Sequence, residues 1–235
     1  MNDDRNKDEI AILEGAFEGV LKLAKMALDE WPEQTVLSPH AKQGEFLYVQ
    51  ALSAAKLAVD YLILRRQPDS LGFKILARHI YENHINASFG ACSPEQTGEC
   101  LLSELNGQKK KLNYKNVMDH EGLRKLAAEC DEEIAKLKVL FGDGLTPRKW
   151  EYRAEKGGLG PTTYFYYRHL CGYAHAGYSS WRPFEASLPD PSLDRMVVNS
   201  VAGTSRILHE WTNQCILEDF LTVMRQVEEL IDGLP

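Results

Sequence analysis

Arg168 and His175 are the two residues of this sequence whose types and spacing best suit a chemical reaction. They are seven positions apart, and seven helical steps of about 100° bring both side chains to one face, roughly 10 Å apart along the axis. A guanidinium is permanently charged and binds phosphate, whereas an imidazole can move a proton near neutral pH. The pair therefore suits a phosphodiester. The same spacing also fits an ordinary packed helix whose polar tips are satisfied by neighbours, so both interpretations stay open.

A second candidate group lies upstream, where Arg78 and Glu82 are four positions apart and so share one face of a helix. His84, six positions after Arg78, diverges from it by about 120° and does not readily serve the same site. An ordinary surface ion pair would explain Arg78 and Glu82. The functional hypothesis is that both line one polar pocket with Arg168 and His175.

Other kinds of catalytic site have less support in the sequence. Four histidines, His79, His84, His169 and His175, could converge, but no HExxH motif or paired Cys/His spacing accompanies them. We therefore expect no metal and no cofactor. Cys171 and His175 are four apart and share a face, but a buried, inert cysteine is the commoner reason for such a residue.

The charge balance limits how the chain could bind nucleic acid. Its formal net charge is −7, so any site for a polyanion must be a local basic cleft. Short basic clusters occur at residues 65–66, 109–111 and 148–149, and we expect each to be solvated surface. The 235 residues, 44% of them hydrophobic, suffice for one core and predict a single domain over residues 1–235.

Cysteine usage and hydropathy bear on the cellular setting. The five cysteines are odd in number and widely spread, with no CxxC pair, so neither a disulfide framework nor a zinc ribbon is indicated. The N-terminus lacks the apolar core of a signal peptide, and no apolar stretch reaches the length of a membrane span. These features predict free thiols, a cytoplasmic location and no contact with a membrane.

Hydrophobic periodicity predicts an all-α chain, folded as an antiparallel helical bundle that must position these side chains. The N-terminal helix falls within residues 1–35 and the bundle within 36–235, with irregular segments near 142–161 and 177–191. The expected helices cover residues 9–31, 38–66, 71–89, a segment that starts at residue 93, 119–141, 164–176 and 192–231.

The segment around Arg168 resembles known families. Arg168 and His175, with six residues between them and the polar His169 directly after the arginine, resemble the motif of the HEPN superfamily in an all-helical bundle. The same segment is similar to a bacterial family of unknown function, in which a tyrosine-rich helix ends in Y-x-x-L-[SC]-x-Y-x-H. An upstream R-x-x-x-E pair of that family matches Arg78 and Glu82. The resemblance covers roughly residues 40 to 230.

The HEPN resemblance implies a metal-independent ribonuclease whose cleft forms between two subunits. It implies that Arg168 holds the scissile phosphate, that His175 acts as general base or acid, and that His169 orients the site. Tyr164 and Tyr167 would support the pocket. The implied partners are an RNA substrate, a second copy of the chain, and an antitoxin or other partner protein in a toxin or anti-phage context.

Whether the chain is an enzyme stays open at this stage. A non-catalytic helical module would use the same Arg/His/Glu pocket to bind a nucleotide, a small ligand or a partner. A hydrolase that uses Glu82 and His175 with a metal is a third possibility.

Overall fold

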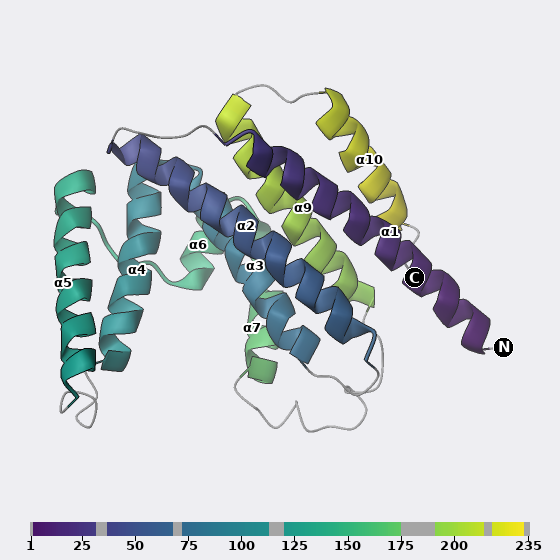
Figure 1. The fold of residues 1–235 in the computed structure, drawn as a ribbon, viewed down its shortest axis with the longest axis horizontal. Helices are drawn as coiled ribbons and strands as arrows, with labels where there is room; N and C mark the ends of the chain where they lie inside the picture. The colour runs from purple at the N-terminus through teal and green to yellow at the C-terminus, as the bar shows by residue number, and fades with distance from the viewer. Residues whose placement is uncertain are drawn as a thin grey trace.

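The computed structural model describes residues 2–31, 37–67, 72–112, 120–174, 191–213 and 218–232. Within these residues the chain forms helices and no strand, so the prediction of an all-helical fold is confirmed (Figure 1). The helices are α1 (Asn2–Asp29), α2 (Pro39–Arg65), α3 (Gly72–Gly90), α4 (Pro94–Leu112), α5 (Glu121–Phe141), α6 (Trp150–Lys156), α7 (Gly160–Ala174), α9 (Pro191–Asn213) and α10 (Glu218–Asp232).

Two helices begin where serine followed by proline predicts a start. The Ser38 hydroxyl accepts a hydrogen bond from the backbone N–H of Ala41 at 3.0 Å, and α2 begins at the next residue. The Ser93 hydroxyl accepts one from the N–H of Gln96 at 3.2 Å, directly before α4. Each serine satisfies an N–H group that has no partner within the first turn of the helix.

The structure corrects two of the predicted elements. α6 lies inside the segment 142–161 that we expected to be irregular, because a seven-residue helix is too short to show hydrophobic periodicity. The single helix expected over residues 192–231 is two helices, α9 and α10, which run in opposite directions with α1 between them (Figure 1). Gly203 is the only glycine or proline between residues 192 and 231, so neither of these residue types stands at the break between the two helices.

The main core forms where α1, α2, α3 and α9 pack together, with α10 on the outer side of α1 (Figure 1). α10 faces α1 with Phe220, Val223 and Val227, all buried at helical spacing. Gly19 of α1 allows this close packing, because a Cβ atom there would lie 2.4 Å from Cγ2 of Val227. Burial of these apolar faces is the main stabilising contribution to the bundle.

A buried polar contact fixes the N-terminal end of α9 against α2. Asp194 is 4% exposed and accepts hydrogen bonds from the Tyr61 hydroxyl at 2.6 Å and from Arg65 at 2.9 and 3.0 Å. One member of the basic cluster 65–66 is thus part of a buried ion pair, so the prediction of a solvated surface cluster is wrong for Arg65. The bidentate contact between Arg65 and Asp194 fixes the position of α9 along α2.

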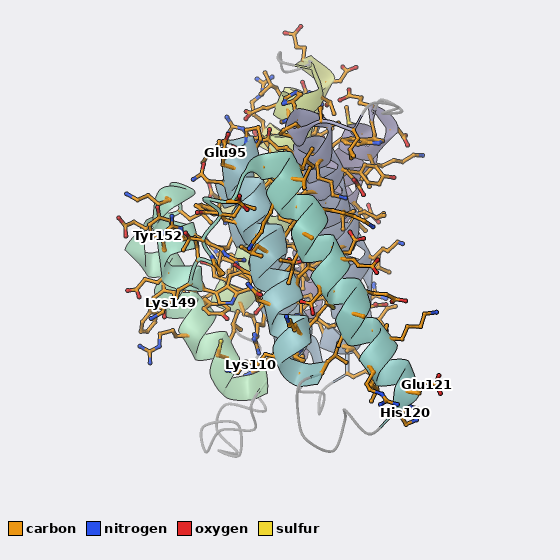
Figure 2. All side chains as sticks on the ribbon, turned by 90° about the vertical axis from the view of Figure 1, so that its left-hand side faces the viewer. Glu95, Lys110, His120, Glu121, Lys149 and Tyr152 are labelled. Atoms are coloured by element: carbon orange, nitrogen blue, oxygen red, sulfur yellow. The ribbon has the colours of Figure 1, made fainter. Side chains whose placement is uncertain are left out.

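α4 and α5 form a flanking pair beside this core (Figure 2). α5 lies along α4 and carries a largely charged outer surface, whereas α6 and α7 pack against α3. α3 therefore contacts α2, α4, α6, α7 and α9, and the elements of the candidate site meet around it.

α2 is long and apolar enough, by length and composition, to cross a membrane, so the expectation that no apolar stretch reaches that length is wrong. In its most apolar window, 33% of the residues are buried inside the structure. The core helix of a soluble protein has the same length and composition, so this property alone does not identify a membrane span.

Candidate functional site

The structure describes only part of the predicted pair on α7. Arg168 is an exposed residue of this helix. His175 lies outside the described residues, and so does the side chain of His169. α7 is helical up to Ala174, the residue before His175, so the helix on which the spacing argument depends is present up to that point. The joint role of Arg168 and His175 stays a prediction.

Arg78 and Glu82 form the predicted ion pair, and they do so in a partly buried setting. Arg78 Nε lies 3.0 Å from Glu82 Oε1, with side chains 17% and 14% exposed. His79 Nδ1 contacts the other carboxylate oxygen at 3.0 Å. Burial opposes the charged form of Glu82, but the hydrogen bonds and charges of His79 and Arg78 outweigh it, so the pKa of this carboxyl is lowered. Glu82 is therefore an anion at neutral pH, and the pair is not an ordinary surface contact.

Tyr167 connects α7 to this ion pair. Its ring is buried, and the Arg78 guanidinium lies 5.9 Å from the ring centroid. Tyr164 and Trp150 place their rings 6.1 and 5.2 Å from that of Tyr167. Burial, a hydrogen bond to Cys171 and the Glu82 charge raise the pKa of the Tyr167 phenol, so it stays neutral. The structure thus brings Tyr164 and Tyr167 together beside Arg78.

Arg78 and Glu82 open into a polar pocket of about 570 Å³ between α3, α4 and α6. Its charged lining consists of four cations and two carboxylates: Arg78, Lys111, Arg148, Arg153, Glu82 and Glu104. In a chain of net charge −7 this lining is a local concentration of positive charge. It is the kind of basic cleft that an acidic protein needs in order to bind a polyanion.

Arg153 is the most deeply placed cation of the pocket, at 3% exposed. Its Nη1 donates to Asn86 Oδ1 at 2.7 Å, and its Nε donates to the Arg148 carbonyl at 3.2 Å. The guanidinium also stacks on Trp150, 4.8 Å from the ring centroid. Sequence reasoning missed Arg153 and Trp150, because they lie on the short helix α6 that periodicity could not detect.

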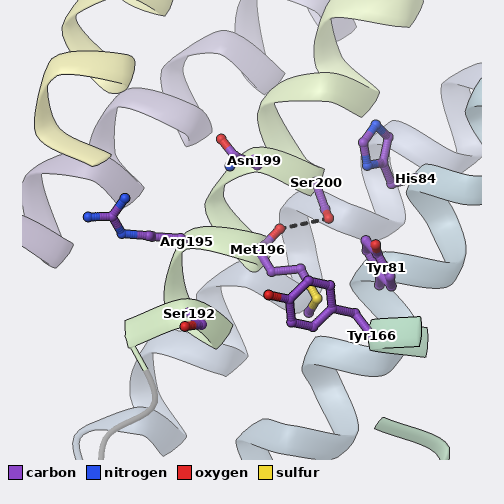
Figure 3. A pocket seen from close by; sticks show the side chains of 8 residues that line it. All are labelled: Tyr81, His84, Tyr166, Ser192, Arg195, Met196, Asn199 and Ser200. Carbon is purple, nitrogen blue, oxygen red and sulfur yellow. Dashed lines mark hydrogen bonds between the residues drawn. The ribbon is translucent and has the colours of Figure 1, made fainter. Parts of the chain in front are cut away.

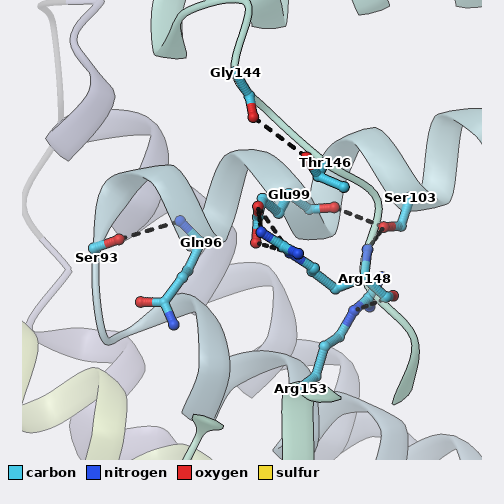
Figure 4. A network of polar contacts seen from close by, with 8 residues as sticks. All are labelled: Ser93, Gln96, Glu99, Ser103, Gly144, Thr146, Arg148 and Arg153. Atoms are coloured by element: carbon cyan, nitrogen blue, oxygen red, sulfur yellow. Dashed lines mark hydrogen bonds and ion pairs between the residues drawn. The ribbon is translucent and has the colours of Figure 1, made fainter. Parts of the chain in front are cut away.

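Arg148 attaches the segment before α6 to α4 (Figure 4). Its guanidinium forms a bidentate contact with Glu99, with Nε 3.0 Å from each carboxylate oxygen. Its backbone N–H donates to the Ser103 hydroxyl at 3.2 Å. The cluster 148–149 was expected to be solvated surface; the Arg148 side chain is 34% exposed, but it is also the partner of Glu99, which is only 8% exposed and requires one.

Glu104 is the second carboxylate of the pocket lining. Partial desolvation by the pocket walls and repulsion from Glu82 raise the pKa of its carboxyl, although Arg153 partly offsets both. Glu104 also accepts a hydrogen bond from Asn86 at 3.4 Å. Two carboxyls with pKa values shifted in opposite directions, Glu82 down and Glu104 up, face one pocket. Such divergence is more frequent at functional sites than elsewhere.

In the part of the chain that the structure describes, no group of three or more His, Cys, Asp or Glu side chains could hold a metal ion. Cys171 is half-buried and a free thiol, whereas burial raises the pKa of the Cys100 thiol to about 12. Cys215 lies outside the described residues.

Comparison with known proteins gives one match. A model of the family of unknown function DUF5677 matches residues 46–186, which is more than half of the chain. This agrees with the expected similarity to a family of unknown function. Comparisons with curated proteins and with solved structures give no match. The matched range begins within α2 and includes α3 to α7, and with them the whole polar pocket and the tyrosine-rich helix.

Proposed function

This chain belongs to the family of unknown function DUF5677, and we propose that it is a metal-independent endoribonuclease with a HEPN-like bundle. The observation that carries the proposal is the cation-lined pocket beside α7, in a chain that is otherwise acidic. Tyr167 joins the pocket to α7, because it packs on Arg78. A substrate phosphate near Arg168 would therefore lie close to a second group of positive charges.

The pocket would hold the backbone of the RNA rather than cleave it. Phosphate contacts from arginine and lysine supply most of the sequence-independent affinity for nucleic acids. Arg153 is held rigidly, so little conformational entropy is lost when it binds an anion. Trp150 and Tyr164 are only partly buried, and such aromatic faces can stack on unpaired bases. These features favour single-stranded RNA.

The chemical step would take place at the C-terminal end of α7. His175 removes the proton of a ribose 2′-hydroxyl, and the 2′-oxygen attacks the adjacent phosphorus. The bond from phosphorus to the 5′-oxygen breaks, and that oxygen receives a proton from an imidazolium, which leaves a 2′,3′-cyclic phosphate and a 5′-hydroxyl. Arg168 stabilises the charge that develops on the phosphate, and His169 orients the group. Arg78 and Glu82 act as positioning residues through Tyr167.

We place this activity in a cytoplasmic homodimer, in which the second copy completes the cleft and supplies the second imidazole. The proposed biological role is that of a toxin or anti-phage effector that a partner protein restrains.

A non-catalytic binding module is the second candidate. The observation that favours it is the ion pair of Arg78 with Glu82. Each of these charges already has its partner within the protein, so the two side chains can form one rigid wall of a binding pocket. This module would bind RNA or another anion through the pocket and leave it intact.

The state of total RNA in cells that produce the protein distinguishes the two candidate functions. We expect wild type to fragment cellular RNA and slow growth, and His175→Ala, produced at the same soluble level, to do neither. Lys111→Met, at an exposed cation of the pocket lining, should weaken both effects through loss of RNA affinity. Intact RNA in cells that contain the wild-type protein would contradict the nuclease proposal and favour the non-catalytic binding module.

A further inference from the structure

A cavity of about 350 Å³ lies between α3, α7 and α9, outside the proposed nuclease site (Figure 3). Its charged lining residue, Arg195, already has an interaction within the protein, so the lining specifies no ligand chemistry. The outer face of α2 carries a more specific pattern. Apolar residues occur all round this helix, and a helix of that kind is usually covered on every side.

The structure leaves an apolar stripe of α2 uncovered. Val49, Val59 and Ile63 are between 44% and 51% exposed, and Leu52 is partly exposed. Their spacing of three, seven and four residues puts all four side chains on one face of the helix. Ile75, near the start of α3, is also exposed, and it lies at the same end of the hairpin as Ile63, because α2 and α3 are consecutive and antiparallel (Figure 1). We call these five residues the α2 stripe.

Two charges of opposite sign accompany the stripe. Lys56 and Asp60 are exposed and four residues apart, and neither has an ion pair in the part of the chain that the structure describes. A twofold axis that passes midway between them would set α2 of a second copy antiparallel to α2 of the first. Lys56 would then face Asp60 of the partner subunit, and the same contact would recur on the other side of the axis.

The apolar residues fit the same arrangement. Val59 lies next to the proposed axis, so the two copies of this side chain would meet there. Ile63 and Leu52 lie at nearly equal distances on either side of the axis, so Ile63 would pack on Leu52 of the partner subunit. One symmetry operation therefore pairs both the charges and the apolar side chains of this face.

The α2 stripe also borders the arginine-lined pocket. His79 follows Ile75 by four residues, so the two share a face of α3. His79 is exposed, and its Nδ1 lies 3.0 Å from a carboxylate oxygen of Glu82, which lines the pocket. A second copy seated on the stripe would therefore lie at the edge of the pocket that is proposed to hold RNA.

A lipid bilayer is the other apolar environment that could cover such a helix. Lys56 and Asp60 stand near the middle of the stripe, and charged side chains are costly to place in hydrocarbon. In a twofold contact each of them gains a partner of opposite charge instead. The charges thus favour a second copy of the chain.

We propose that two copies of this protein associate through the α2 stripe, with two reciprocal ion pairs between Lys56 and Asp60 at the centre. This surface deepens the homodimer of the proposed function, on which it rests, and it does not depend on RNA cleavage.

Sedimentation equilibrium of the full-length protein measures the dissociation constant of the dimer. Lys56→Glu and Asp60→Lys each turn two attractive contacts into repulsive ones, so each should raise that constant by at least about tenfold. An equimolar mixture of the two variants should restore the dimer, because every facing pair in the mixed dimer again has opposite charges. Circular dichroism should show the same helix content in both variants and wild type.

Val59→Lys should also raise the dissociation constant by at least about tenfold, because it places two lysines beside the axis. Val139→Lys is the matched control, since Val139 is an exposed valine of α5, outside the stripe. A dimer that the charge substitutions do not weaken, or that the mixture does not restore, would overturn this surface alone.

A wild-type monomer would overturn the homodimer together with this surface. Binding of that monomer to neutral phosphatidylcholine vesicles, lost with Val59→Lys, would identify the stripe as a membrane face instead. RNA left intact by the wild-type protein would contradict the nuclease proposal and leave the sedimentation results unchanged.

Discussion

Acidification from pH 7 to pH 5 should destabilise this protein through His84. As a whole residue His84 keeps some exposed surface, but its Nδ1 is shielded from solvent and burial lowers the pKa of the ring to about 4. In the unfolded chain the imidazole has its ordinary pKa of about 6.5. Between about pH 4 and pH 6.5 the unfolded chain therefore carries a proton on His84 that the folded protein does not carry. The stability that neutral His84 contributes is complete above about pH 6.5 and is lost as the pH falls toward 4.

The size of the effect follows from the two pKa values. At pH 5 most unfolded chains carry the proton on His84 and most folded chains do not. The linkage relation gives a loss of about 2 kcal/mol between pH 7 and pH 5. A protein of this kind has a total stability of roughly 5–15 kcal/mol, so the loss is readily measurable.

Urea unfolding at pH 7, 6 and 5 measures this loss directly. Wild type should lose about 2 kcal/mol more than His84→Gln, which has no group that titrates in this range. His120→Gln is the matched control, because His120 is exposed at the start of α5 and its side chain makes no capping hydrogen bond. If wild type and His84→Gln showed the same pH dependence, the imidazole would not be buried in its neutral form against Gly203 of α9, where a Cβ atom would lie 2.5 Å from His84 Nε2.

Two further substitutions test the packing and the polar pocket. Gly44→Ala should lower the free energy of unfolding in urea by about 1–3 kcal/mol, because its Cβ would lie 2.1 Å from the Trp211 ring. Gly107→Ala is the control and should be neutral or slightly stabilising, because a Cβ there would meet no neighbouring atom within 4 Å. Arg153→Met should cost about 3 kcal/mol, because it leaves the buried Asn86 carbonyl without its charged donor; a cost below about 1 kcal/mol would show that the guanidinium is not fixed there.

Helix starts, helix faces and the Arg78–Glu82 pair could be predicted from the sequence, because each depends on residues near one another in the chain. The serine caps before α2 and α4 are examples, since a capping hydrogen bond spans only three residues. The ion pair is another, because an i, i+4 spacing puts both side chains on one helical face. Its partial burial was not predictable, since Tyr167 and α7 cover it from a distant part of the sequence.

The wider pocket could not be predicted, because its residues come from three helices and have no common local pattern. Arg153 is 67 residues away from Asn86, its buried partner, and Arg148 is 49 residues away from Glu99. From the sequence, Arg148 was expected to be solvated surface, and nothing singled out Arg153. Only the packing of α6 against α3 and the contact of Arg148 with Glu99 of α4 show that one arginine is buried and the other is paired with a buried carboxylate.

The central claim is that this protein cleaves RNA without a metal and uses His175 to do so. The most direct measurement incubates the purified protein with a defined single-stranded RNA in EDTA and identifies the new 3′ ends. We predict 2′,3′-cyclic phosphate ends with wild type and intact RNA with His175→Ala, for a variant that unfolds at the same urea concentration as wild type. Intact RNA with wild type, or equal cleavage by both proteins, would contradict the account.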